Sequence, residues 1–435
     1  MNILVLSRAV VGRKMASPGI RAYHLAGALG RAMPEAEVTL AIPGDKGEVP
    51  LPAPNVRMQV WASNGDATAL ARSHDISIAR NFPPQFARLL GQKRFALDAF
   101  TPLYIEWMEL SKRDIEPKWR RTWMSSNRWY INLQLTLADF LFCADERQRD
   151  LWIGMLMALA LVPPDTYERD PSLRKLIDIV PYGVPGHPLD AQGPVLKGVI
   201  PGIAETDRIL LWNGGITEWN DPLTLIRAMD ELRARRPEVK LVFMGVNHPD
   251  YAFGPEVGVS LQAITLAKDL GLEGRSVFFL DGWVPYERID DYLAEADASV
   301  CLGYENVESR FAFRTRYVDL FRARVPLLCT QGDVLADRVA SDPMGITVPE
   351  RDVDGVVAGI ERLLDDAAFA QTCREGMAKI AGELSWDLAV EPLVRFCQSE
   401  GSYAIPADRR TVQANARAGI YLAMKKLCLS PPRIT

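Results

Sequence analysis

The chain alternates short apolar runs with longer segments whose apolar residues recur at helical spacing. In the first half, helical periodicity separates the apolar runs, as in Ile20–Arg31 and Asp145–Leu161. Such alternation is typical of a mostly parallel sheet with helices on both faces. The predicted strands are Asn2–Leu6, Val38–Ile42, Ile76–Ile78, Arg94–Asp98, Phe140–Cys143 and Ile177–Val180.

The same alternation starts again after Pro181–Gly202, which is dense in proline and glycine and reads as a linker. The predicted strands of this half are Ile209–Trp212, Lys240–Met244, Ser276–Leu280, Ala298–Leu302, Pro326–Cys329 and Gly345–Val348. The predicted helices are Pro222–Arg235, Val259–Leu270, Tyr286–Ala294, Phe313–Ala323 and Val353–Asp365.

A length of 435 residues exceeds one ordinary domain. We expect an α/β protein with two Rossmann-like domains, residues 1–195 and 205–385, that face each other across a cleft. Residues 386–435 begin with a helix capped at Ser385–Asp387 and end in the basic, partly apolar segment Arg409–Cys428. The favoured interpretation packs these helices on the first domain, and the alternative is an amphipathic helix on a membrane surface.

Composition narrows the function classes. Apolar residues make up 48% and charged residues 24% of the chain, as in soluble globular proteins. A net charge of −5 argues against nucleic acid as the main partner. The chain opens on a core strand rather than a signal peptide, and its longest apolar run, Leu151–Val162, is too short to span a bilayer.

Cysteine and histidine usage completes this picture. The 6 cysteines lie mostly within apolar segments, and neither CxxC nor HExxH spacing occurs. Buried thiols in a reducing compartment account for this pattern better than disulfides do. We therefore expect a cytoplasmic protein without a catalytic metal.

Small and polar residues follow the predicted strands of the second half. The segment NGG at 213–215 follows Ile209–Trp212, and DGW at 281–283 follows Ser276–Leu280. Glycine lets a ligand approach the backbone, and ligands of open α/β sheets bind beyond the carboxyl ends of strands. For the second segment, a plain turn with a packed tryptophan is the alternative. The candidate ligand contacts are Gly214, Gly215, Gly282 and Trp283.

Two segments of the first half have the same placement. SPGIR at 17–21 opens a helix, where backbone N–H groups, such as that of Gly19, attract an anion. Asp98 ends a predicted strand and is a candidate contact for a donor sugar or an acceptor, and Arg80-Asn81 follows another strand. A plain strand-to-helix turn is the alternative at Gly19.

The segment 305–330 joins a polar loop, a helix start and an apolar strand. Carboxylates in a loop at a strand end can grip sugar hydroxyls, and guanidinium groups suit phosphate. The alternatives are solvated glutamates and an ordinary surface pair between an arginine and an aspartate three residues apart. The candidates are Glu305, Glu308, Arg314, Arg316 and Asp319.

Taken in order, these segments resemble the GT-B fold glycosyltransferases of retaining family 4, also called group 1. The most specific match is FRTR at 313–316 with Asp319 and Val325-Pro326, which is similar to a bacterial subgroup. SPGIR at 17–21 and NGG at 213–215 support it. The resemblance implies a hexosyltransferase that moves a sugar from a nucleotide diphosphate donor to a hydroxyl acceptor, with retention and without a metal or other cofactor.

The resemblance also implies residue roles. Asp319 takes the place of a family glutamate that binds the ribose, and Phe311 stands where a second family glutamate is expected. Glu305 and Glu308 are the candidates to replace that glutamate. The family's arginine and lysine near residues 213–215 are missing, so Arg314 and Arg316 are expected to stabilise the leaving diphosphate. Thr315 and the glycines named above complete the expected donor site.

The acceptor class stays open between a polysaccharide, a lipid-linked sugar and a small molecule. Tryptophans and arginines gather in the first half, and with the basic tail they suit an anionic membrane at its inner face, although helix packing explains them as well. Two other functions are alternatives: a nucleotide-sugar epimerase or phosphorylase of the same fold, and a non-catalytic carbohydrate- or partner-binding protein. The residues of the aromatic, basic stretch are Trp107, Trp119, Arg120, Arg121, Trp123, Arg128 and Trp129.

Overall fold

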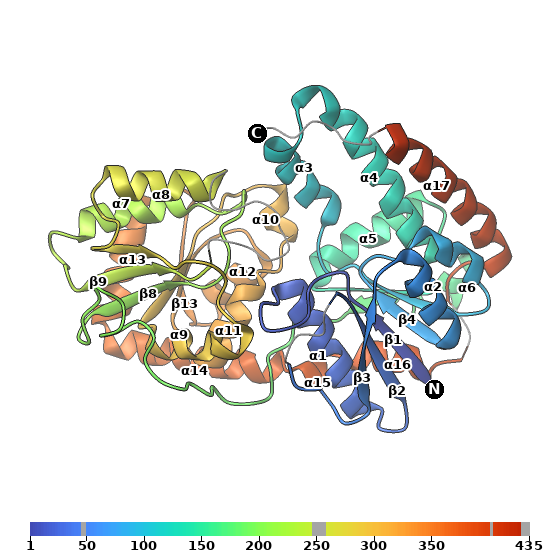
Figure 1. The fold of residues 1–435 in the computed structure, drawn as a ribbon, viewed down its shortest axis with the longest axis horizontal. Helices are drawn as coiled ribbons and strands as arrows, with labels where there is room; N and C mark the ends of the chain where they lie inside the picture. Colours follow the sequence, from blue (N-terminus) through green and yellow to red (C-terminus); the bar gives the residue numbers. More distant parts are fainter. Residues whose placement is uncertain (45–48, 246–257, 401–402, 428–435) are drawn as a thin grey trace. The chain divides into compact units, whose positions relative to one another are not determined.

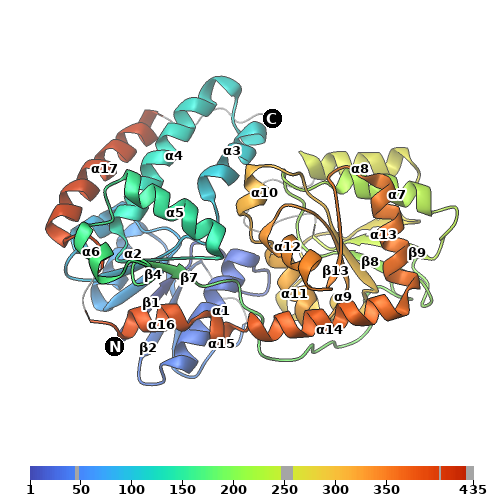
Figure 2. The same ribbon diagram turned by 180° about the vertical axis from the view of Figure 1, so that it is seen from behind.

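The computed structural model describes residues 1–44, 49–245, 258–400 and 403–427. The chain forms two compact units, drawn from opposite sides in Figures 1 and 2. The first unit comprises residues 1–12, 17–182 and 386–435, and the second comprises residues 13–16 and 183–385. The division falls at residues 182 and 183, at the start of the predicted linker.

The first unit is built on a sheet of 7 strands in the order β3-β2-β1-β4-β5-β6-β7. All neighbouring strands are parallel. The order reverses between β1 and β4, where Leu6 lies opposite Ala79. The strands are β1 (Asn2–Leu6), β2 (Glu37–Pro43), β3 (Val56–Trp61), β4 (Ile76–Ala79), β5 (Arg94–Asp98), β6 (Phe140–Cys143) and β7 (Ile177–Ile179).

Helices cover this sheet. The central strands β4 and β6 are buried along their whole length, as expected for parallel strands packed on both faces. The covering elements are α1 (Ser17–Ala32), α2 (Asn64–Ser73), η1 (Pro84–Leu89), α3 (Leu103–Asp114), α4 (Pro117–Leu137), α5 (Glu146–Ala158) and α6 (Pro164–Arg169).

The strand β3 was not predicted from the sequence. It lies at the edge of the sheet, and only Val56 and Trp61 at its ends are buried. Because the residues between them are exposed or half-buried, the sequence VRMQVW lacks the apolar run of an interior strand.

The second unit has a sheet of 6 strands in the order β10-β9-β8-β11-β12-β13, again with parallel neighbours throughout. The order reverses between β8 and β11. The strands are β8 (Arg208–Trp212), β9 (Val239–Phe243), β10 (Val277–Phe279), β11 (Ala298–Cys301), β12 (Leu327–Thr330) and β13 (Gly345–Val348). The helices are α7 (Pro222–Leu232), α8 (Val259–Asp269), η2 (Tyr286–Arg288), α9 (Ile289–Glu295), α10 (Val307–Phe311), α11 (Thr315–Ala323), α12 (Val334–Ser341), α13 (Val353–Asp365) and α14 (Ala367–Glu383). The predicted α/β class with two parallel-sheet domains is confirmed.

One helix differs from its prediction in a way that matters for the site. The expected helix Phe313–Ala323 begins only at Thr315, and the short helix α10 precedes it. Phe313 is 8% exposed and packs in the core before α11 begins. Arg314 is therefore the residue at the helix start rather than a residue within the helix.

The C-terminal segment returns to the first unit as α15 (Trp386–Ala389), α16 (Glu391–Gln398) and α17 (Ala407–Leu427). Figures 1 and 2 both show α17 alongside α4. Arg410 of α17 is 3% exposed and donates to Ala138 O at 2.7 Å and to the Asp139 carboxylate. The favoured interpretation, a C-terminal helix packed on the first domain, is confirmed.

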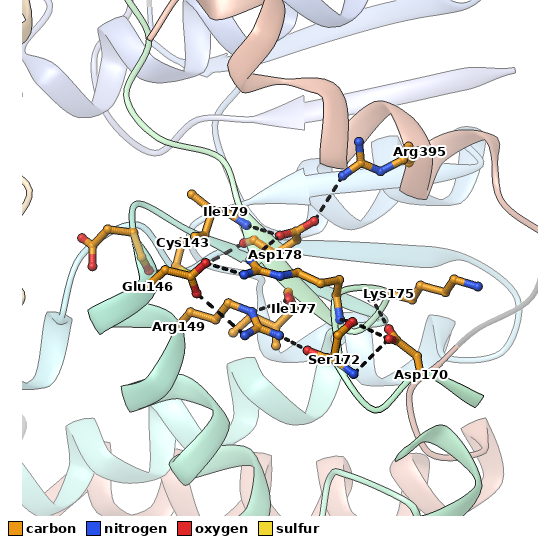
Figure 3. Close-up of polar contacts among 12 residues, drawn as sticks. Cys143, Glu146, Arg149, Asp170, Ser172, Lys175, Ile177, Asp178, Ile179 and Arg395 are labelled. Carbon is orange, nitrogen blue, oxygen red and sulfur yellow. Dashed lines mark hydrogen bonds and ion pairs between the residues drawn. The ribbon is translucent and has the colours of Figure 1, made fainter. Parts of the chain in front are cut away.

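A second polar network holds α16 against β7, the strand that leads into the linker (Figure 3). Asp178 of β7 accepts from Arg174 Nη1 at 2.8 Å and from Arg395 Nη2 of α16 at 3.2 Å. Arg174 also bonds Glu146 of α5, and Arg149 Nε donates to Ile177 O at 3.0 Å. These contacts tie α5, β7 and α16 together.

The buried Arg410 yields a stability prediction. Replacing Arg410 with Met should lower the free energy of unfolding by about 3–5 kcal/mol, because the Asp139 carboxylate loses its buried cation. The neighbouring exposed residue provides the control, since Arg409→Met removes the same charge from solvent. Urea denaturation followed by circular dichroism compares the two variants, and equal losses would contradict the assignment.

Candidate functional site

The carboxyl ends of β8 and β11 mark the point in the second sheet where the strand order reverses. In open α/β sheets this point opens a crevice in which ligands bind. The loop 213–215 leaves β8 there, and the loop 303–305 follows β11. The strand order thus places the predicted glycine loop and Glu305 at the same edge of the sheet.

Arg316 lies against the glycine loop. Its Nη2 donates to Gly215 O at 2.7 Å, and its guanidinium carbon lies 5.4 Å from the centre of the Trp212 ring. Asn213 Nδ2 donates in turn to Arg316 O at 2.8 Å. The Nη1 of Arg316 is buried and has no hydrogen-bond partner among the described residues. Because an unpaired buried donor is costly, this atom is suited to an acceptor that a ligand supplies.

The backbone around Arg316 favours a negative charge as well. Gly214 has a φ of +105°, a conformation that suits glycine, and a Cβ at this position would lie 3.8 Å from the Arg316 guanidinium carbon. Helix α11 has no side-chain cap at its N-terminus, so its first amides, beginning with Thr315, lack a capping acceptor. A guanidinium group beside an uncapped helix N-terminus is an anion-binding arrangement.

The loop after β10 lies next to the glycine loop. Gly282 has a φ of +80°, and Trp283 packs over Gly245, where a Cβ would meet the ring at 2.9 Å. A Cβ on Gly245 would also lie 3.4 Å from Gly214 C. The structure therefore brings Gly214, Gly282 and Trp283 to one end of the sheet.

Arg314 occupies a different environment from the predicted one. Its Nη1 and Nη2 donate to the two oxygens of Glu308 at 3.0 and 2.7 Å, and Glu308 is 2% exposed. Burial acts to lower the pKa of Arg314, but the Glu308 carboxylate, with Asp333 and Tyr317, raises it above its usual value. Asp333 lies 4.0 Å from Arg314 Nε and accepts from the Tyr317 hydroxyl at 3.2 Å. Arg314 and Glu308 thus neutralise each other away from solvent.

Burial also raises the pKa values of two aspartates in this region, Asp333 and Asp319. It raises the pKa of Asp333 to about 6, although Arg314 opposes this shift. It also raises the pKa of Asp319 to about 6, with Arg322 lowering and Asp290 raising it further. Asp319 is half-buried and lies one turn after Arg316.

Glu305 is the exposed carboxylate near this end of the sheet. Its backbone N–H donates to Glu350 Oε2 at 2.9 Å. Within the described ranges, no side chain or backbone group bonds the Glu305 carboxylate itself. Of the two predicted glutamates, Glu305 is available to a sugar hydroxyl and Glu308 is engaged by Arg314.

The predicted residues of the first unit also have defined surroundings. Asp98 is 5% exposed, and both of its oxygens accept from Arg21, at 2.8 and 3.0 Å. Arg21 donates further to Val180 O and Pro181 O, each at 2.9 Å. Asp98 therefore anchors the chain at the start of the linker instead of being open to a substrate. Gly19 is buried in the first turn of α1.

Asp333 and Tyr317 were missed as parts of this region. A signal for Asp333 is present in the sequence, because an aspartate between a strand and a helical segment is a typical N-cap. Its carboxylate accepts from Leu335 N at 2.9 Å and from Ala336 N at 2.8 Å. Tyr317 reads only as one of the apolar positions of α11, and its contact with Asp333 depends on the fold.

Neither a metal site nor a membrane-spanning helix is found in the described residues. Among the residues that the structure describes, no three histidine, cysteine, aspartate or glutamate side chains gather closely enough to hold a metal ion. Over the same ranges, no helix combines the length and apolar character needed to cross a membrane.

Part of the second unit matches a known protein family. Residues 199–379 match the family model described as glycosyl transferases group 1. No curated protein matches the chain.

Solved structures match nearly the whole chain at low sequence identity. A sucrose-phosphate synthase from Thermosynechococcus elongatus is 16% identical, with a TM-score of 0.61 over 91% of this chain and 98% of the other. Anabaena Alr3699/HepE in complex with UDP and glucose is 13% identical, with a TM-score of 0.59 over 91% and 99%. A protein described as trehalose-6-phosphate from E. coli, bound with UDP-2-fluoro glucose, is 12% identical, with a TM-score of 0.60 over 92% and 99%.

At these identities the likeness is one of fold. The neighbours share the GT-B fold, in which two parallel-sheet domains are joined in one chain. The chain therefore has the GT-B fold, and its residues 199–379 are similar to the glycosyl transferases of group 1.

Proposed function

We propose that the protein is a hexosyltransferase that moves a sugar from a nucleotide diphosphate donor to a hydroxyl acceptor. The observation that carries the proposal is the buried Arg316 Nη1, which lacks a partner within the described part of the chain and lies beside Gly215 at the point where the sheet order reverses. The group 1 match of residues 199–379 supports it, and so do the sugar nucleotides in the structures of two neighbours.

Arg316 supplies the main electrostatic effect in this proposal. As the bond between the sugar and the diphosphate breaks, negative charge develops on the leaving diphosphate. The Arg316 guanidinium and the first amides of α11 are fixed in place before the reaction, so they stabilise that charge without reorganising. These groups supply positive charge at the phosphates, which supports a reaction without a metal.

The other residues act on the rest of the donor. The Asp319 carboxylate accepts from the ribose hydroxyls, and Glu305 accepts from hydroxyls of the sugar. Gly214, Gly215 and the loop with Gly282 and Trp283 let the nucleotide approach the backbone. The Gly19 N–H gives a further donor to the diphosphate. The resemblance to retaining family-4 enzymes supports transfer with retention of configuration.

Arg314 and Glu308 have a positioning role in the proposal. Their bidentate ion pair connects α10 to the start of α11, and Asp333 and Tyr317 complete the buried cluster. The cluster sets the position of α11 and therefore of Arg316. We leave Asp98 out of the catalytic set, because Arg21 occupies both of its oxygens.

The proposal includes a cytoplasmic protein that contacts an anionic membrane. Helices α17 and α4 run antiparallel, since Arg410 bonds Ala138 and the Tyr421 and Tyr130 rings are 5.0 Å apart. The end of α17 thus lies along the first half of α4. The exposed side chains of this region include apolar residues, which can enter a lipid surface, and cations, which anionic lipids attract. The apolar residues are Met108, Ile420 and Leu422, and the cations are Lys112, Lys118, Arg121, Arg128, Lys425 and Lys426.

The first experiment is a thermal-shift screen of nucleoside diphosphates and their sugars, because a ligand of the folded state raises apparent stability. With the matching donor, Arg316→Gln should lower the transfer rate by about 10²–10³-fold. The exposed Arg324 gives a matched control, Arg324→Gln, that should keep the wild-type rate. Normal turnover of the Arg316 variant would remove Arg316 from the reaction.

Three further readouts belong to this experiment. Turnover that survives EDTA supports the metal-independent reaction, and loss with EDTA contradicts it. Sugar epimerised when only the nucleotide sugar is present would assign the protein to the epimerases. Donor binding without turnover on a broad acceptor panel would assign it to the non-catalytic binding proteins.

The raised pKa of Asp319 gives a pH prediction. Only the ionised carboxylate accepts from two ribose hydroxyls, so nucleotide affinity should rise as the pH increases through about 6. The variant Asp319→Asn should bind more weakly at pH 7.5 and lose this pH dependence. Isothermal titration calorimetry between pH 5 and 7.5 tests it, and a wild-type dependence that persists in the variant would assign the titration to another group.

Membrane contact is tested by co-sedimentation with vesicles that contain phosphatidylserine. Each basic residue near such a surface contributes roughly 1 kcal/mol. Reversing both charges in Lys425→Glu/Lys426→Glu should therefore lower binding more than tenfold. Reversal at two exposed arginines outside this end, Arg72→Glu/Arg324→Glu, is the control. Equal binding by both variants, or none by the wild type, would contradict membrane contact at this end.

A further inference from the structure

The sheet of the first unit reverses its strand order between β1 and β4, and two arginines follow these strands. Leu6 at the end of β1 lies opposite Ala79 at the end of β4. Arg8 therefore leaves the sheet beside Arg80, at the edge where ligands of open α/β sheets bind. The proposed function assigns no role to either arginine.

Arg80 has an incomplete set of partners. Its Nη2 donates to Thr101 Oγ1 at 2.8 Å, and its Nε is buried with no hydrogen-bond partner among the residues that the structure describes. No carboxylate of the described chain lies within 4 Å of the Arg80 guanidinium. Arg80 is half-buried, so this position holds a guanidinium group that no carboxylate of the described residues neutralises.

The partners of Arg8 among the described residues are neutral groups. Its Nε donates to Asn81 O at 3.3 Å, and its Nη2 donates to Asn64 Oδ1 at 3.2 Å. The Trp61 ring lies 5.6 Å from its guanidinium carbon. The aspartate at the end of the next strand, Asp98, is bonded on both oxygens by Arg21. Two guanidinium groups therefore flank the β1–β4 switch, and no carboxylate of the described chain pairs with either.

The switch point of the second unit shows the same chemistry. There Arg316 bonds a carbonyl rather than a carboxylate and keeps one buried donor unpaired. A buried guanidinium is paired with an acid at Arg314 and Arg410. Arg80 and Arg316 instead each keep one buried N–H without an acceptor among the described residues, which suits an anion from outside the chain, and the exposed Arg8 lies beside Arg80 with its charge open to such an anion.

We propose that Arg8 and Arg80 form an anion subsite that binds a phosphate or carboxylate group of the acceptor. The identification of the ligand as the acceptor rests on the proposed function, in which the second unit binds the donor. The anion subsite itself rests on the geometry of the first unit. It narrows the acceptor to molecules that carry a negative charge near the hydroxyl that receives the sugar.

The test titrates the full-length chain with inorganic phosphate and, separately, with acetate at constant ionic strength. All proteins carry Arg316→Gln, which silences the anion site of the second unit. Thermal stability reports binding. The test variant adds Arg8→Gln/Arg80→Gln, and the control adds Arg72→Gln/Arg88→Gln, which removes two exposed arginines of the same unit. A third variant, Arg8→Lys/Arg80→Lys, keeps the charge.

Saturable binding of one anion, weakened about tenfold or more in the glutamine variant, is the expected result, because each lost bond to a charged group is worth a tenfold change or more. The control variant should keep the anion affinity of the Arg316→Gln parent, and the lysine variant should recover part of that affinity. Preference for phosphate or acetate tells the two acceptor classes apart. Equal affinity in test and control variants, or no saturable binding of either anion, would overturn the proposal.

The two proposals fail separately. Loss of nucleotide affinity in Arg316→Gln concerns the donor site alone and is measured without the first-unit variants. If no nucleotide binds but phosphate affinity still depends on Arg8 and Arg80, the proposed function fails and the anion subsite stands. If nucleotide binds and the anion affinity does not depend on these arginines, only the subsite fails.

Discussion

The ion pair between Arg314 and Glu308 determines the chemistry available in the second unit. It buries one arginine and one glutamate of the same segment with each other, and Asp333 and Tyr317 close the cluster from the other side. Breaking a buried pair leaves an uncompensated charge that costs several kcal/mol. The pair therefore fixes the start of α11, and the next arginine, Arg316, is directed to the glycine loop after β8.

Parallel sheets explain why the remaining polar groups gather. Both units have parallel strands throughout, so the loops at the carboxyl ends of the strands meet at one edge. In each unit the order reverses once, between β1 and β4 and between β8 and β11. At both reversals lie guanidinium groups that no carboxylate of the described residues pairs. The fold thus offers two places for anionic groups, which suits the proposed transfer of a sugar from a diphosphate to a charged acceptor.

Much of this arrangement could be predicted from the sequence, because apolar runs and turn chemistry are local signals. The interior strands have clear apolar runs, and the predicted helix Pro222–Arg235 begins as α7 at Pro222, where Asp221 accepts from Thr224 N at 3.0 Å. The glycine loops follow from the same logic. The edge strand β3 was missed because its middle is exposed and carries no apolar run.

The partners of charged side chains depend on the fold and were beyond prediction. Asp98 and Arg21 are far apart in the sequence, and only the packing of α1 on β5 brings them together. Arg314 was expected within the helix Phe313–Ala323, and its ion pair with Glu308 depends on the break between α10 and α11. Arg8 and Arg80 likewise meet only because β1 and β4 are neighbours.

The central claim is that Arg316 binds the diphosphate of the donor. A crystal structure of the full chain with the nucleoside diphosphate found by the thermal-shift screen tests it most directly. The account predicts a phosphate oxygen that accepts from Arg316 Nη1 and lies at the N-terminus of α11, with the Arg314–Glu308 pair unchanged. A diphosphate bound elsewhere with Arg316 Nη1 still unpaired, or bound to Arg314 released from Glu308, would contradict it.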